Sequence, residues 1–104
     1  MKSIKPAFII VLLGVVSLLS GCLTGTIRGQ VIDNYDRPVV GAIVSTRPPT
    51  ESVRTTEDGY VIKNVPVGEY RVIADKPGYH EGSQEIQVQW SQTTGADIQI
   101  ERKE

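Results

Sequence analysis

Apolar and polar residues alternate in short runs along most of the chain after residue 25. The clearest runs contain Tyr60 with Ile62, and Tyr70 with Val72 and Ala74, where every second residue is apolar. Strict alternation of this kind is typical of strands that bury one face. The pattern predicts strands at residues 26–32, 39–46, 52–56, 60–63, 69–76, 84–89 and 95–100.

Turn-forming residues separate these runs, and no helical periodicity follows the first part of the chain. Asp58-Gly59 and Pro77-Gly78 predict turns, and residues 64–68 predict a corner between two strands. Short strands at this spacing, joined by glycine and proline turns, are typical of an all-β sandwich. We therefore predict a seven-stranded antiparallel β-sandwich over residues 26–101, followed by a polar tail at 102–104.

The alternation also assigns side chains to the core. Gly29 lies within this pattern, which predicts a bulge or a close approach of another backbone at that position. We expect the following residues to point inward: Ile27, Gly29, Val31, Val40, Ala42, Val44, Tyr60, Ile62, Tyr70, Val72, Ala74, Ile86, Val88, Ile98 and Ile100.

Residues 1–21 have a different pattern and predict a lipoprotein signal peptide. Lys2 and Lys5 precede a continuous, mostly apolar run at residues 7–19. Such a run suits the apolar region of a signal peptide and is shorter than the roughly 20 residues that a membrane-spanning helix needs.

The apolar run ends in Leu19-Ser20-Gly21-Cys22, which resembles the lipobox of bacterial lipoproteins. The resemblance implies that the Cys22 thiol accepts a diacylglyceryl group and that a signal peptidase recognises Leu19, Ser20 and Gly21. Cleavage before Cys22 would leave an acylated cysteine and a short tether at 22–25. The alternative is a free thiol at the edge of an uncleaved anchor helix.

These features predict a lipid-anchored protein of the bacterial cell envelope, held by palmitate-like acyl chains on Cys22. Several acyl chains anchor firmly, because each buried CH₂ contributes about 0.8 kcal/mol. Cys22 is the only cysteine, so no disulfide can form within the chain. Leu23 follows Cys22 where an Asp would favour the inner membrane, so in a host with two membranes we expect the outer one.

The charge pattern argues against a nucleic-acid partner. The chain has 11 Lys or Arg and 12 Asp or Glu, and cleavage before Cys22 would remove Lys2 and Lys5. The signs are interspersed, with no basic run that could follow a phosphate backbone. We expect contacts with the membrane and with an envelope protein or polysaccharide.

No pattern for catalysis or for a cofactor is present. His80 is the only histidine, so no histidine pair for a metal can form, and no nucleophile motif accompanies it. Asp33, Asn34 and Asp36 carry oxygen atoms that calcium prefers, but the spacing lacks the remaining ligands of an EF-hand. We therefore interpret these three residues as turn formers and expect no metal, no cofactor and no enzyme activity.

Trp90 is the most ambiguous of the aromatic residues. It continues the inward positions of Ile86 and Val88, so we expect it to close one end of the core. The alternative is a loop-tip position, where Trp90 with Tyr79 or Tyr35 would form an aromatic contact site for a sugar ring or a partner protein.

Five segments, in this order, resemble the carboxypeptidase regulatory-like domain: GQVID (29–33), RPVVGAIV (37–44), TTEDGY (55–60), VPVGEY (65–70) and PGY (77–79). The resemblance implies a transthyretin-like, or prealbumin-like, seven-stranded sandwich. It implies a non-catalytic binding or structural module and no peptidase activity. The alternative function is a carbohydrate-binding module that uses exposed aromatic residues such as Trp90.

Overall fold

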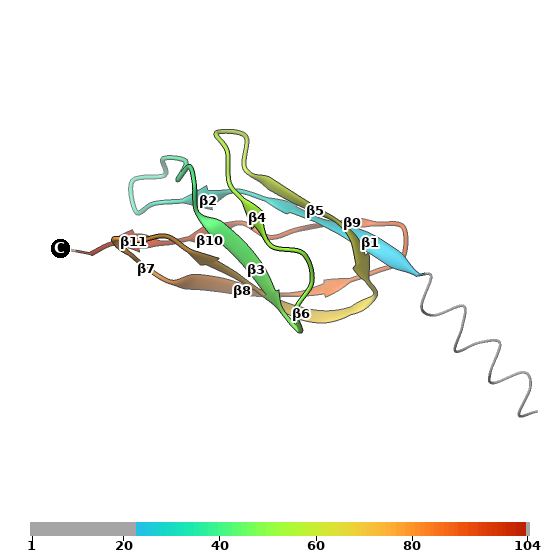
Figure 1. Cartoon of the computed structure of the whole chain (residues 1–104). Coiled ribbons are helices and arrows are strands. Elements are labelled where there is room, and N and C mark those ends of the chain that lie inside the picture. Colours follow the sequence, from blue (N-terminus) through green and yellow to red (C-terminus); the bar gives the residue numbers. More distant parts are fainter. Residues whose placement is uncertain (1–22, 104) are drawn as a thin grey trace, which may run out of the picture.

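The computed structural model describes residues 23–103 (Figure 1). Within this range the chain forms eleven strand segments and no helix. A search of the same residues for an apolar helix that could cross a membrane finds none. The predicted signal peptide at 1–21 and the predicted acylation site at Cys22 lie outside the described residues.

The segments are β1 (Thr24–Gly29), β2 (Val31–Ile32), β3 (Ile43–Arg47), β4 (Val53–Arg54), β5 (Tyr60–Pro66), β6 (Gly68–Asp75), β7 (Tyr79–His80), β8 (Gly82–Val88), β9 (Thr93–Gly95), β10 (Ile98–Gln99) and β11 (Glu101–Arg102). Interruptions of one or two residues separate β1 from β2, β7 from β8, and β9 from β10 and β11. The eleven segments therefore form seven runs, with β5 and β6 counted separately because they belong to different sheets.

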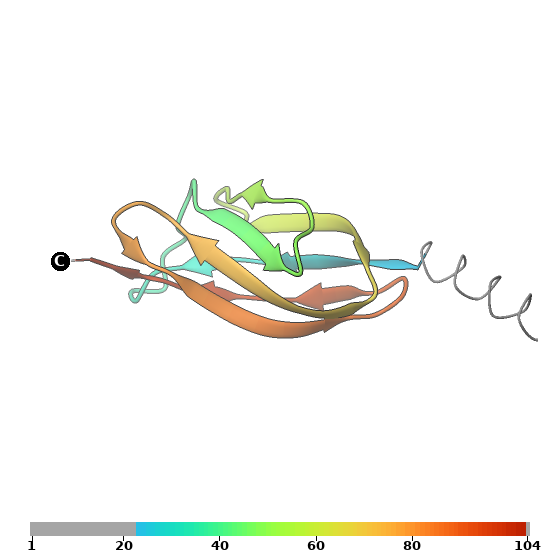
Figure 2. The ribbon, with the colours of Figure 1, turned by 60° about the horizontal axis from the view of Figure 1, so that its bottom comes forward.

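These runs build two sheets (Figures 1 and 2). The first contains the order β5-β1-β9 and continues as β10-β2, and the second has the order β4-β3-β6-β8. The last run leaves the first sheet at its end, where β11 pairs with β7. The predicted all-β sandwich is confirmed.

One feature departs from the expected antiparallel arrangement. The last run lies parallel to the first, because β9 pairs with β1 and β10 pairs with β2 in the same direction. After β8 the chain turns and crosses to the other sheet, so that it lies beside β1. Alternation reports which face of a strand is buried and carries no information about which strands pair.

The core lies between the two sheets and contains most of the residues predicted to point inward. Fully buried aliphatic side chains from both sheets meet there, and Tyr60 and Tyr70 are buried with them. The buried cluster is Ile27, Val31, Val39, Ala42, Val44, Tyr60, Ile62, Val65, Tyr70, Val72, Ala74, Val88, Ala96, Ile98 and Ile100, with Ile86 partly buried against it.

The prediction that Val40 points inward is wrong. Val40 is 47% exposed, and its neighbour Val39 is buried instead. Residues 39–42 form a turn around the buried Thr55 hydroxyl, which donates to the Val39 carbonyl oxygen at 2.6 Å and accepts from the Ala42 amide at 3.0 Å. Alternation does not apply outside a strand, so β3 begins only at Ile43.

The corner predicted at 64–68 is smaller in the structure. β5 continues through Pro66, and only Val67 separates it from β6. Asn64 adopts a φ of 60° inside the strand, and the register with β1 shifts between Gly25 and Ile27. The turn-forming Asn64 therefore marks a β-bulge, where an extra residue bends the strand.

The ends of the sandwich also differ from the prediction. Tyr79 and His80, expected in a loop, form β7, and Arg102, expected in a polar tail, ends β11. These two short segments pair with each other across more than 20 residues of sequence. Neither has an alternating pattern, so only the tertiary arrangement reveals them.

The backbone of the last run lies close against Gly29, which confirms the approach expected there. A Cβ atom on Gly29 would collide with the Ala96 carbonyl group. The buried Tyr60 hydroxyl donates to the same carbonyl oxygen at 2.5 Å. Burial raises the pKa of Tyr60, and the nearby Asp97 charge adds to this effect.

We expect Gly29→Ala to destabilise the sandwich by more than about 2 kcal/mol, since the added methyl group meets backbone that cannot move aside. Gly95→Ala is the matched control, because a Cβ atom on Gly95 has no neighbour within 4 Å. Its effect should stay within about 1 kcal/mol. Urea unfolding of both variants measures the difference, and equal stabilities would contradict the close contact at Gly29.

Candidate functional site

Trp90 is 64% exposed, so the prediction that it closes the core is wrong. β8 ends at Val88, and the chain turns through residues 89–92, where the Gln92 amide donates to the Gln89 carbonyl oxygen at 3.3 Å. Ser91 adopts a φ of 58° in this turn. Trp90 therefore no longer follows the alternation of the strand.

The structure does not bring the three predicted contact residues together. Tyr35 and Tyr79 line one hollow of about 320 Å³, which we call the far-end hollow. Trp90 borders a different hollow, of about 330 Å³, formed with Thr24, Asn64 and neighbouring residues. The full lining of the far-end hollow is Asp33, Asn34, Tyr35, Arg37, Pro38, Tyr79 and Arg102.

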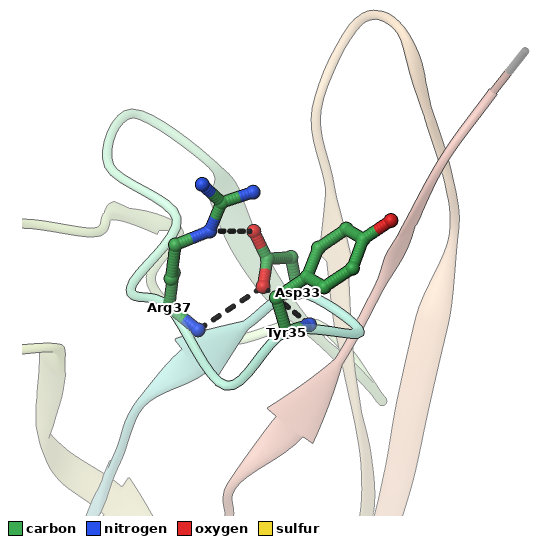
Figure 3. A network of polar contacts seen from close by, with 3 residues as sticks. All are labelled: Asp33, Tyr35 and Arg37. Atoms are coloured by element: carbon green, nitrogen blue, oxygen red, sulfur yellow. Dashed lines mark hydrogen bonds and ion pairs between the residues drawn. The ribbon is translucent and has the colours of Figure 1, made fainter.

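The loop after β2 forms one wall of the far-end hollow, and Asp33 fixes its shape (Figure 3). The Asp33 carboxylate accepts hydrogen bonds from the backbone amides of Tyr35, at 2.8 Å, and Arg37, at 3.0 Å. The Arg37 guanidinium donates to it as well, at 3.3 Å. The interpretation of Asp33 as a turn former is confirmed.

These contacts stabilise the charged form of the Asp33 carboxyl. The backbone amide of Arg37 contributes most, and the amide of Tyr35 and the Arg37 guanidinium add to it. Desolvation acts in the opposite direction but is outweighed, so the pKa of Asp33 lies below its ordinary value of 3.8.

Cationic side chains lie over both aromatic rings of the far-end hollow. The Arg37 guanidinium carbon is 5.0 Å from the centre of the Tyr35 ring, and that of Arg102 is 5.9 Å from the centre of the Tyr79 ring. Lys76 also lies over Tyr79, at 5.7 Å. Aromatic faces and guanidinium donors together suit a ligand with flat apolar surfaces and polar edges.

Sequence reasoning missed Arg37 and Arg102 as members of this site. Arg102 reaches Tyr79 only because β11 pairs with β7, and no local pattern predicts that pairing. Arg37 could have been found, because it follows Asp33 by four residues in a loop rich in turn formers.

His80, Arg71 and Glu85 do not line the far-end hollow. His80 lies in β7 opposite Glu101. Within residues 23–103, no group of three or more His, Cys, Asp or Glu residues is arranged to hold a metal ion. A shallow hollow of about 480 Å³ lies over β6 and β8, where Arg71 and Glu85 form an exposed ion pair at 2.8 Å.

The predicted lipidation residues Leu19, Ser20, Gly21 and Cys22 lie outside the described residues. The sandwich begins directly after them, since Thr24 and Gly25, expected in the tether, are the first residues of β1. The Leu23 carbonyl oxygen already accepts a hydrogen bond from the Val67 amide, at 3.2 Å.

We expect the stability of Asp33→Asn to approach that of the unmodified protein as the pH falls. A carboxyl with a lowered folded-state pKa contributes stability above its unfolded value, here 3.8, and this contribution is lost as the pH falls through the folded value. At neutral pH the variant should be less stable. Urea unfolding of both proteins, from neutral pH down to below the folded-state pKa of Asp33, measures this difference in stability. The exposed Asp36→Asn variant is the control. A stability difference that persists at low pH would contradict the assignment.

Several solved structures of other proteins contain a similar fold. The chain is similar to the Bacillus anthracis TIE protein, with 20% identity and a TM-score of 0.64, over 77% of this chain and 17% of that one. It is also similar to GBS52, the minor pilin of Streptococcus agalactiae, with 14% identity and a TM-score of 0.64, over 79% and 46%. A third is 3-chlorocatechol 1,2-dioxygenase from Rhodococcus opacus 1CP, with 13% identity and a TM-score of 0.57, over 77% and 61%.

This chain spans less than two thirds of the length of each of these proteins. They include a pilin and an enzyme, so the shared fold does not decide the function. A search of curated proteins finds no match. The family model of the carboxypeptidase regulatory-like domain matches residues 26–101. Together with the all-β sandwich, this match shows that the chain belongs to the carboxypeptidase regulatory-like domain family.

Proposed function

We propose that this chain is a membrane-anchored lipoprotein of the bacterial cell envelope, whose sandwich is a non-catalytic binding or structural module. The observation that carries the proposal is the position of Cys22. A lipobox-like segment, Leu19 to Cys22, ends one residue before Leu23, whose backbone already belongs to the sandwich. The anchor and the folded domain are thus directly adjacent in the chain.

The chemistry of Cys22 supports the anchor. Its thiol would form a thioether with a diacylglyceryl group, and cleavage before it would free an amine for further acylation. Two or three acyl chains hold a protein far more firmly than one, at about 0.8 kcal/mol for each buried CH₂. Leu23 at the next position favours the outer membrane in a host with two membranes.

The make-up of the domain supports a binding or structural role. Within residues 23–103 every buried side-chain nitrogen or oxygen atom has a hydrogen-bond partner. The buried polar side chains are thus paired within the fold, and the groups that can contact a ligand lie on the surface. A minor pilin shares the fold, which agrees with a structural role in the envelope.

Labelling with a palmitate analogue tests the anchor. The unmodified protein should incorporate the label and fractionate with membranes, and Cys22→Ala should do neither, because the thiol that accepts the lipid is gone. The surface variant Val40→Ala should behave as the unmodified protein. A labelled, membrane-bound Cys22→Ala protein would refute the proposal.

The far-end hollow favours a second candidate, binding of an envelope polysaccharide. Tyr35 is 70% exposed there and lies in the same hollow as Tyr79. Exposed aromatic rings can pack against the apolar faces of sugars, and the guanidinium groups of Arg37 and Arg102 can donate to sugar hydroxyls. The contacts would then come from Tyr35 and Tyr79, without Trp90.

Retention on immobilised envelope polysaccharide measures this second function. Tyr35→Ala should weaken retention about fivefold to tenfold, as expected when an aromatic anchor worth more than 1 kcal/mol is removed. Tyr35→Phe keeps the ring and should retain most of the binding. Equal retention of Tyr35→Ala and the unmodified protein would exclude Tyr35 as a contact.

A further inference from the structure

Three segments at one end of the sandwich contain no charged residue. They lie at residues 23–26, 64–68 and 89–94, and we call them together the anchor-end surface. None of them contains Asp, Glu, Lys, Arg or His, although Lys63 and Glu69 border the second segment. The opposite end is rich in charge, with Asp33, Asp36, Arg37, Lys76, Glu81, Glu101, Arg102 and Lys103.

Backbone hydrogen bonds hold the three segments together. The Val67 amide donates to the Leu23 carbonyl oxygen at 3.2 Å, and the Ser91 amide donates to the Thr24 carbonyl oxygen at 2.9 Å. Both views show the start of β1, the β5–β6 corner and the β8–β9 connection at the same end of the molecule (Figures 1 and 2). The position of this surface relative to Leu23 is therefore fixed by the fold.

Each of the two connections at this end presents an exposed apolar side chain. Val67 is 45% exposed in the β5–β6 corner, and Trp90 is 64% exposed in the β8–β9 turn. Tight turns normally carry polar residues at such positions. Tryptophan is enriched where proteins meet the headgroup region of a membrane, because its ring is apolar and its N–H can still donate to a polar group.

We propose that the anchor-end surface rests in the headgroup region of the lipid bilayer, with Trp90 and Val67 inserted among the lipids. This inference rests on the proposed acylation of Cys22. Consecutive Cα atoms are about 3.8 Å apart, so acyl chains on Cys22 would enter the bilayer within one residue of Leu23. The uncharged segments beside Leu23 then meet the membrane without the cost of desolvating a charge.

The proposal fixes the orientation of the domain as well as its location. With the anchor-end surface on the membrane, the first run of the sandwich leads away from the bilayer. The loop after β2 and the pair β7–β11 lie at the opposite end of the sandwich (Figure 1) and line the far-end hollow, which would then face away from the bilayer.

Trp90 is the only tryptophan, so its fluorescence reports on this surface without interference. The acylated protein, purified from membranes, is reconstituted into vesicles of phosphatidylethanolamine and phosphatidylglycerol. We expect the Trp90 emission to shift to shorter wavelength than in the denatured protein in water. Bromine-labelled acyl chains should quench it, and dissolved iodide should lose access.

Val67 and Val40 offer a matched pair of variants, because their exposures are 45% and 47% and they lie on different loops. Val67→Asp places a charge in the anchor-end surface and should reduce the quenching of Trp90 by brominated lipid. Val40→Asp, next to the charged end, should leave the quenching unchanged.

The outcomes separate this inference from the proposed anchor. Protein that floats with the vesicles and carries acyl chains, but whose Trp90 stays open to iodide, would overturn the inference and leave the anchor intact. A spectral shift that grows with the number of proteins per vesicle would overturn it too, because a second copy would then cover Trp90. Protein without acyl chains on Cys22 would overturn both.

Discussion

The contact between Gly29 and the Ala96 carbonyl group is the constraint on which the sandwich depends. The absence of a side chain at Gly29 lets the last run lie against the first, and the Tyr60 hydroxyl binds the same carbonyl oxygen. The Ala96 carbonyl group thus contacts residues of both β1 and β5, and these strands form the first sheet together with the last run. A Cβ atom on Gly59 would collide with the Gly29 carbonyl oxygen. The turn before β5 therefore also packs against the backbone of Gly29.

The parallel pairing of the first and last runs gives the domain two distinct ends. The first and last runs both start at the end near Leu23 and both finish at the opposite end, where β11 pairs with β7. The uncharged connections gather at the first end and the charged loops at the second. The proposed anchor on Cys22 would therefore do more than hold the domain at the membrane, because it would also decide which side chains face the bilayer and which face a partner.

Local patterns in the sequence predicted the parts of the structure that depend on local physics. Alternation correctly placed Tyr60, Ile62, Tyr70, Val72 and Ala74 in the core. Asp33 was correctly interpreted as a turn former, since its carboxylate accepts hydrogen bonds from two backbone amides of its loop. The inward positions predicted for Val40 and Trp90 were wrong because neither residue belongs to a strand. Val40 lies in a turn around Thr55, and Trp90 lies in a turn after β8. The parallel pairing and the meeting of Arg102 with Tyr79 join residues far apart in the chain, so no local pattern could predict them.

The intact mass of the protein isolated from the membrane fraction tests the proposed lipid anchor most directly, because one measurement reports both the modification of Cys22 and the site of cleavage. The account predicts a chain of residues 22–104 carrying a diacylglyceryl group on Cys22, with or without a further acyl chain on its amine. A mass that corresponds to an unmodified Cys22, or to a chain that still contains residues 1–21, would contradict it.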